Sequence, residues 1–166
     1  MIRTSRTPGT RLTLLALAFL AAAPSAAFAD ATLFIGANTT PANRMARGVA
    51  VGVSLLVVGV EFEYSNTVED AKVAAPSLKT GMANLLLQTP VEIFGLQPYV
   101  TAGAGLYRET LEAHQNTSPA VSTGGGVKIA LVGPLRLRLD YRVFKLGGGA
   151  LNSPAHRVYA GLNLKF

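Results

Sequence analysis

From residue 30 onward, apolar and polar residues alternate with a period of two, which is typical of β-strands and not of amphipathic helices. The segment LRLRLDYRVFK, residues 135–145, is the clearest example, because its leucines, tyrosine and valine alternate with arginines and one aspartate. The chain ends on a similar segment, residues 156–166, with apolar side chains on one face and Arg157 and Lys165 on the other. Such a strand needs an apolar phase on one side, which is either a protein core or lipid.

The same pattern predicts eight strands. Residues 49–64 alternate throughout but change parity, and a single strand of that length would extend roughly 50 Å at ~3.3 Å per residue. We therefore predict a tight turn between Ser54 and Val57, although no Gly, Pro or Asn marks it; one long bulged strand is the alternative. The predicted strands are residues 32–38, 49–54, 58–64, 78–88, 97–110, 121–131, 135–145 and 156–166.

The links between the predicted strands alternate in length. Those after the second and sixth strands are short, and the one around residues 89–96 is intermediate. Long links at one end and short turns at the other indicate an up-and-down meander whose strands pair in sequence order. The long, polar links are residues 39–47, 66–77, 111–119 and 146–155.

The polar faces of four predicted strands carry charged residues, whereas the opposite faces are aliphatic and aromatic. In an inside-out barrel the charges face a narrow interior and pair with each other, while the apolar faces meet lipid. Strands of about 10 residues also match a tilted crossing of a bilayer. We therefore predict an all-β fold, an eight-stranded antiparallel up-and-down transmembrane β-barrel; a soluble sheet with a solvated charged face is the alternative. The predicted interior charge network is Glu61, Glu63, Lys128, Arg136, Arg138, Asp140, Arg142 and Arg157.

The predicted strand at residues 97–110 has two possible orientations, because both of its faces carry apolar residues. Tyr99 and Tyr107 could point outward or share the interior with the neighbouring glycines. We predict that the tyrosines point inward, because the other face makes the better lipid contact. That face consists of Val100, Ala102, Ala104 and Leu106.

The first thirty residues indicate export. Three arginines precede an apolar run at residues 12–23, and Ala27-Phe28-Ala29 before Asp30 fits a small-x-small cleavage site. The apolar run is too short for a helix that spans a bilayer, which needs roughly 20 residues. We expect a cleaved signal peptide at residues 1–29 and one barrel domain at residues 30–166. An N-terminal membrane helix is the alternative.

Composition narrows the classes of function. The 166 residues carry a net charge of +6, but three arginines belong to the predicted signal peptide, and no Lys/Arg run indicates nucleic-acid binding. The chain has no cysteine, which excludes disulfides and thiolate metal sites. Glu61 and Glu63 lie on one face of a strand, where ion pairing with arginines is favoured over acid–base chemistry. We predict no enzymatic activity, no cofactor and no metal.

These features together resemble the small eight-stranded outer-membrane barrels of Gram-negative bacteria, of the kind represented by the membrane domain of outer membrane protein A. The resemblance covers residues 30–166 and rests on the signal peptide, the eight-strand rhythm, and the stretches YVTAGAGLYRE, RLRLDYR and YAGLNLKF. In that family the last strand ends in an aromatic residue and is read by the barrel-assembly machinery during insertion. The residues that match this assembly signal are Tyr159, Leu162, Leu164 and Phe166.

The resemblance implies an integral outer-membrane protein with both termini in the periplasm and a structural or surface-interaction role through its extracellular loops. The implied partners are outer-membrane lipids and lipopolysaccharide, and the barrel-assembly machinery; the loop partner stays open. No open pore is expected, because eight strands enclose an interior just wide enough for side chains. No peptidoglycan-binding segment follows Phe166, so a cell-wall tethering role is not expected.

Two alternatives remain at this point. Two outer-membrane barrel families of similar size act on lipid A, so the chain could be a lipid A-modifying or small-ligand-binding barrel. Against this, neither His114 nor His156 shows the His-x-Ser arrangement of the deacylase-like barrels. The further alternative is a soluble periplasmic β-barrel.

Overall fold

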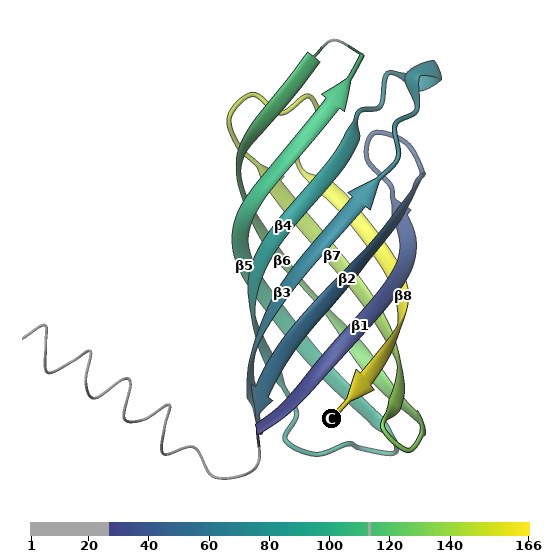
Figure 1. Cartoon of the computed structure of the whole chain (residues 1–166), viewed down its shortest axis with the longest axis vertical. Helices are drawn as coiled ribbons and strands as arrows, with labels where there is room; N and C mark the ends of the chain where they lie inside the picture. Colours follow the sequence, from purple (N-terminus) through teal and green to yellow (C-terminus); the bar gives the residue numbers. More distant parts are fainter. Residues whose placement is uncertain (1–26, 113) are drawn as a thin grey trace, which may run out of the picture.

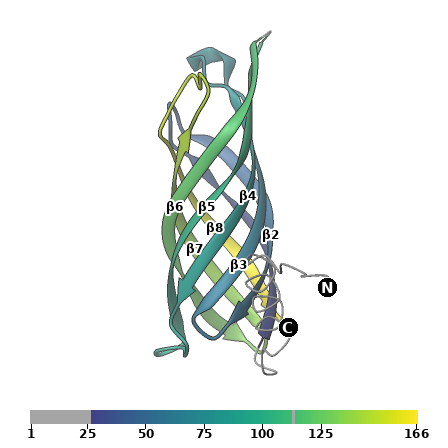
Figure 2. The same cartoon turned by 90° about the vertical axis from the view of Figure 1, so that its left-hand side faces the viewer.

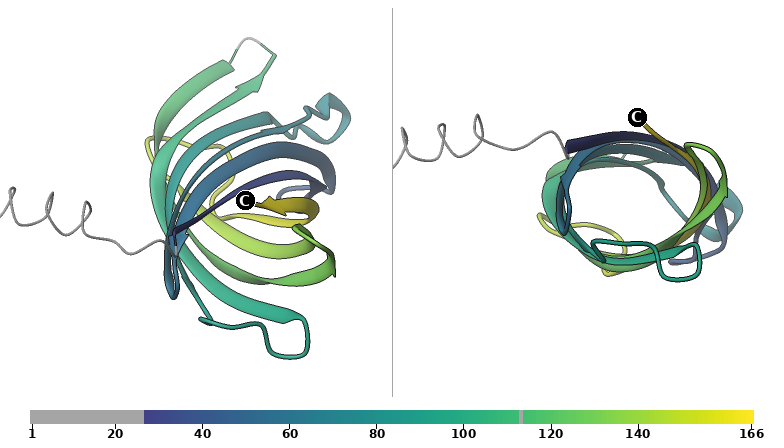
Figure 3. Two further views of the ribbon diagram at one scale, coloured as in Figure 1. Left: turned by 60° about the horizontal axis from the view of Figure 1, so that its bottom comes forward. Right: turned by 90° about the horizontal axis from the view of Figure 1, so that it is seen from below.

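The computed structural model describes residues 27–112 and 114–166. These residues form one closed antiparallel barrel in which each strand pairs with its neighbours in sequence, so the predicted topology is confirmed (Figure 1). Seen from below, the strands make a complete ring (Figure 3). The strands are β1 (Ala27–Asn38), β2 (Arg44–Leu55), β3 (Val58–Thr67), β4 (Ser77–Gln88), β5 (Leu96–Leu111), β6 (His114–Val132), β7 (Leu135–Leu146) and β8 (Ala155–Lys165); a short 3₁₀ turn, η1 (Ala71–Val73), lies between β3 and β4.

The barrel closes where β8 pairs with β1. The register runs from Asp30 opposite Lys165 to Asn38 opposite Arg157. Below this ladder, the amide of Ala29 donates to the carbonyl of Phe166 over 2.8 Å, and the amide of Phe166 donates back over 2.9 Å. In the described chain the last residue is therefore part of the seam, at the same end of the barrel as the start of β1 (Figure 2), and the predicted cleavage after Ala29 would remove this pair. The predicted signal peptide lies outside the described residues up to position 26, and Ala27–Ala29 begin β1.

The tight turn predicted between β2 and β3 is confirmed. β2 ends at Leu55 and β3 begins at Val58, which leaves two residues for the turn. Leu56 has a φ of 48°, in the left-handed region that favours glycine. Because a leucine occupies a position where glycine is usual, the sequence carries no recognisable turn signal there.

The predicted loop at residues 111–119 is wrong. β5 continues to Leu111, β6 starts at His114, and the two form the tall hairpin at the top of Figure 1. Residues Gln115 to Pro119 pair with Thr110 to Leu106. Most of residues 111–119 are polar, so the stretch shows no apolar alternation, and it was interpreted as a loop although the two strands pair there.

The two faces of the barrel wall differ as predicted. Outward side chains are apolar and highly exposed, such as Leu33 at 67% and Phe62 at 62%, whereas the arginines at positions 138 and 142 are 0% exposed. Tyr99 and Tyr107 point inward and are also buried. Large apolar side chains thus cover the outside and the predicted charge network faces the inside, the reverse of a water-soluble barrel.

The interior also contains an apolar layer near the loop end. This layer packs side chains from β4 to β8 against each other above the charged residues. The apolar layer is Leu78, Met82, Tyr107, Ala120, Phe144, Leu146 and Ala155.

None of the helical segments in the described part of the chain has the length and apolar character of a membrane-spanning helix.

Candidate functional site in the barrel interior

The centre of the barrel is built around Glu61, which β3 projects into the interior from the side opposite β7. Its carboxylate forms a two-oxygen contact with the guanidinium of Arg138, and Nη2 of Arg142 donates to Oε1 over 2.9 Å. Arg138 and Arg142 share the inner face of β7 because they lie four positions apart, an even number. One carboxylate thus connects opposite walls of the barrel.

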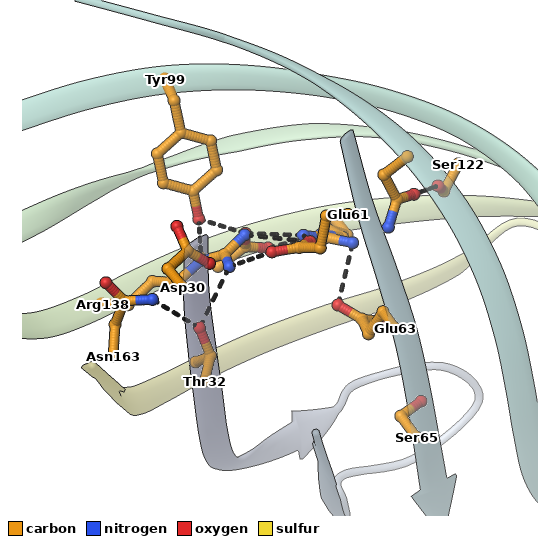
Figure 4. A network of polar contacts seen from close by, with 12 residues as sticks. Asp30, Thr32, Glu61, Glu63, Ser65, Tyr99, Ser122, Arg138 and Asn163 are labelled. Carbon is orange, nitrogen blue, oxygen red and sulfur yellow. Dashed lines mark hydrogen bonds and ion pairs between the residues drawn. The ribbon is translucent and has the colours of Figure 1, made fainter. Parts of the chain in front are cut away.

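Asp140 lies between the two arginines on the same inner face of β7. Its Oδ1 accepts a hydrogen bond from Nε of Arg142 over 3.0 Å, and its Oδ2 lies 3.3 Å from Nη2 of Arg138. The hydroxyl of Tyr99 on β5 donates to Asp140 and accepts from Nε of Arg138 over 2.7 Å. Figure 4 shows Tyr99 reaching down toward Arg138, with Thr32 of β1 on the other side.

A glycine makes room for this tyrosine. Gly126 on β6 lies opposite Tyr99 on β5, and a Cβ added there would come within 2.6 Å of the tyrosine hydroxyl oxygen. The same Cβ would lie 2.1 Å from the backbone carbonyl oxygen of Leu139, so a larger residue at position 126 would disturb both the tyrosine and the pairing of β6 with β7. Gly126 therefore has a specific packing role. The sequence alone assigned no such role to any glycine of the run at residues 124–126.

The cluster extends toward the loop end through Glu63. Its carboxylate pairs with Arg142 over 2.9 Å and also with Arg157 of β8. Arg157 donates to the hydroxyl of Ser65 over 2.5 Å, and its guanidinium lies 4.6 Å from the ring centroid of Phe144. The charged layer is thus joined to the apolar layer above it.

This central cluster contains three guanidinium groups and three carboxylates, from Glu61, Glu63, Asp140, Arg138, Arg142 and Arg157. Each of these residues is 3% exposed or less. Isolated charges at such depth would carry a large desolvation cost, which mutual pairing and hydrogen bonding offset. The arrangement is a compact neutral plug across the barrel.

The remaining two residues of the predicted network lie apart from this cluster. Lys128 pairs with Asp30 of β1 over 2.7 Å. Arg136 pairs with Glu92 over 2.7 Å and donates to Oε1 of Gln97 over 2.8 Å, close to the link between β4 and β5. The eight residues thus form three groups and not one.

Sequence reasoning missed several partners of these charges. Asp30 was assigned to the cleavage site and lay before the first predicted strand, so its inward position was not recognised. Tyr99 was assigned to the interior, but only its burial was predicted and not its contact with Asp140. The alternation along β5, which assigns Tyr99 to the inner face, was the one sequence feature that pointed to this partner.

Comparison with known proteins identifies solved structures that share this fold. No protein-family model and no curated protein sequence matches the chain. Among solved structures, the chain is similar to the N-terminal β-barrel domain of Pseudomonas aeruginosa OprF, with 15% identity, a TM-score of 0.62, and coverage of 84% of this chain and 97% of that one. Neisserial surface protein A gives 19% identity, a TM-score of 0.63, and coverage of 84% and 96%. The chain has the fold of the small outer-membrane barrels.

This outer-membrane barrel fold also occurs in an enzyme. The outer-membrane enzyme PagL is similar over 81% of this chain and 98% of its own, with 10% identity and a TM-score of 0.53. In the present barrel, Nδ1 of His156 lies 2.8 Å from the hydroxyl of Tyr141, and the side chain of His114 lies outside the described structure. In the described part of the chain, no group of His, Asp or Glu side chains is arranged to hold a metal ion.

The C-terminal strand of the barrel divides the predicted assembly residues between two faces. Leu162, Leu164 and Phe166 point outward and are 54%, 44% and 69% exposed. Tyr159 points inward and stacks on Phe34, with ring centroids 4.1 Å apart. The three outward residues form a continuous apolar edge beside the seam, while Tyr159 belongs to the interior packing.

Proposed function

We propose that this chain is a non-enzymatic integral outer-membrane protein with a structural or surface-interaction role at its loop end. The observation that carries the proposal is the division of the wall into an apolar outer face and a charged inner face. Such a wall is stable when lipid surrounds it. The neutral plug and the apolar layer above it fill the interior, which supports a barrel that conducts no ions through its centre.

The loop end provides the surface for an interaction. The hydroxyl of Tyr107 donates to the carbonyl of Gly147, and Nδ2 of Asn116 donates to the carbonyl of Gly148 over 2.9 Å. The amide of Leu151 donates to Oε1 of the buried Glu109 over 2.9 Å. These contacts hold the β7–β8 loop against the β5–β6 hairpin, and a preformed surface loses less entropy on binding than a flexible one.

Cell fractionation combined with surface labelling tests the proposal. We expect the mature chain to begin at Asp30, to enter the outer-membrane fraction, and to migrate differently on SDS gels with and without heating. An epitope inserted after Gly149 should be stained on intact cells, whereas one inserted after Gly133 should be stained only in permeabilised cells. Recovery in the soluble periplasmic fraction would contradict the proposal, and altered lipid A in the presence of the chain would favour the enzymatic alternative.

The C-terminal edge supports a second element of the proposal, recognition by the barrel-assembly machinery. Phe166→Ala should lower the amount of chain in the outer membrane several-fold, because it removes the last apolar side chain of that edge. Phe94→Ala is a matched control, since Phe94 is fully exposed in the β4–β5 link but lies outside the edge. Equal outer-membrane levels for the two variants would contradict a role for Phe166 in assembly.

A further inference from the structure

Three basic residues form a row on the outer face of the barrel, near its loop end. Arg47 of β2, Lys79 of β4 and Arg108 of β5 are all exposed. In the strand register, Arg47 lies opposite Asn66, Asn66 opposite Lys79, and Lys79 opposite Arg108. At about 4.8 Å between neighbouring strands, this basic row spans roughly 15 Å.

No carboxylate of the described residues neutralises the basic row. None of them lies within ion-pairing distance of Arg47, Lys79 or Arg108, although carboxylates of the described chain pair with each arginine of the central plug. Within the described part of the chain, Arg108 donates to the hydroxyl of Thr117 over 3.1 Å. Like charges directly opposite on neighbouring strands destabilise a sheet. The row is therefore a cluster of exposed positive charge that could accept an anion from outside the chain.

An apolar groove begins where the basic row ends. It has a volume of about 530 Å³ and lies on the outer wall across β2 to β5. Its floor contains small residues, including Ala83 and Ala104, which lie opposite each other. Its lining residues Val49, Gly81 and Leu106 each lie two positions from a member of the row.

The row and the groove together have the chemistry of a lipid site. Arginine and lysine bind phosphate through charge-assisted hydrogen bonds, and an apolar groove in the wall accepts a hydrocarbon chain. The loop end of the barrel faces the outer leaflet if the proposed function holds, and this inference rests on that orientation. We propose that Arg47, Lys79 and Arg108 bind the phosphates of an outer-leaflet glycolipid of the lipopolysaccharide class, with one acyl chain in the groove.

Two matched pairs of variants separate the head-group contact from the acyl contact. Lys79→Gln removes a cation of the row, and Lys145→Gln removes an exposed lysine of β7 outside it. Gly81→Leu fills the groove, and a Cβ at position 81 meets no atom within 4 Å. Ala160→Leu makes a similar change in a second outer groove of about 360 Å³, which no basic residue lines.

Binding is measured by native mass spectrometry of the full barrel in detergent micelles, with purified bis-phosphorylated lipid A as the probe. We expect Lys79→Gln to weaken binding by about fivefold, the effect of one basic residue near an anionic lipid surface, and Gly81→Leu to weaken it as well. The two control variants should bind like the original chain. Chemically dephosphorylated lipid A should bind more weakly to the original chain and should no longer distinguish Lys79→Gln from it.

Several outcomes would overturn the inference. Equal affinity of Lys79→Gln and Lys145→Gln would exclude the row as the phosphate site. Full competition by inorganic pyrophosphate, with no effect of Gly81→Leu, would indicate a free phosphate ligand instead of a lipid. Failure of the proposed function is distinguishable, because it appears in fractionation of the unmodified chain and not in these affinities.

Discussion

Replacing Glu61 by glutamine is expected to lower the free energy of unfolding by about 3–5 kcal/mol, the usual cost of breaking a buried ion pair from one side. Glu61 is 1% exposed and pairs with both Arg138 and Arg142. Glutamine keeps the shape of the side chain but leaves two buried guanidinium groups with one carboxylate fewer. The chain has no tryptophan, so urea unfolding in detergent is followed by circular dichroism or by gel mobility.

Glu69→Gln is the matched control for this experiment. It removes the same charge from an exposed position in the β3–β4 loop, where the side chain forms no ion pair with any described residue. We expect its unfolding midpoint to match that of the unmodified chain. A Glu61→Gln midpoint equal to that of the control would show that the interior carboxylate contributes no stability and that the plug is not an interacting network.

The second large effect is expected on the outer wall. Leu139→Arg should destabilise the barrel in lipid vesicles by about 2–4 kcal/mol, because it places a charge on the lipid face near the middle of the membrane. Leu139 points outward from β7 between the inward residues Arg138 and Asp140. The measurement is the unfolding free energy of the barrel refolded into vesicles of defined thickness.

The same substitution at Leu151 controls for the chemistry of arginine itself. Leu151 is similarly exposed, at 47% against 40% for Leu139, but it lies in the β7–β8 loop outside the wall. Leu151→Arg should change stability little. If Leu139→Arg were equally harmless, the outer face of the wall would be in contact with water.

The alternation of apolar and polar residues was sufficient to predict which side of the barrel wall each residue faces. A residue on β7 is either in lipid or in the interior, and the period of two assigns each residue from its parity. The hairpin of β5 and β6 was missed because residues 111–119 are mostly polar, so no apolar alternation marks a face there. The predicted loop at residues 111–119 is the result.

Partner choice inside the barrel could not be predicted in the same way. Glu61 and Arg138 are 77 residues apart and meet across the interior, not between neighbouring strands. Their contact depends on the tilt of the strands and the reach of each side chain, which parity does not encode. Lys128 accordingly pairs with Asp30, a residue outside every predicted strand.

The orientation of the wall is tested most directly by two single-cysteine variants of this cysteine-free chain, spin-labelled in lipid vesicles. Leu85 and Leu86 are adjacent identical residues on β4, at 60% and 4% exposure, so their labels report opposite faces. We expect the Leu85→Cys label to collide with lipid-dissolved oxygen and hardly with a water-soluble nickel complex, while the Leu86→Cys label is shielded from both. A Leu85→Cys label as accessible to the nickel complex as one at the loop position Leu151 would contradict this orientation of the wall.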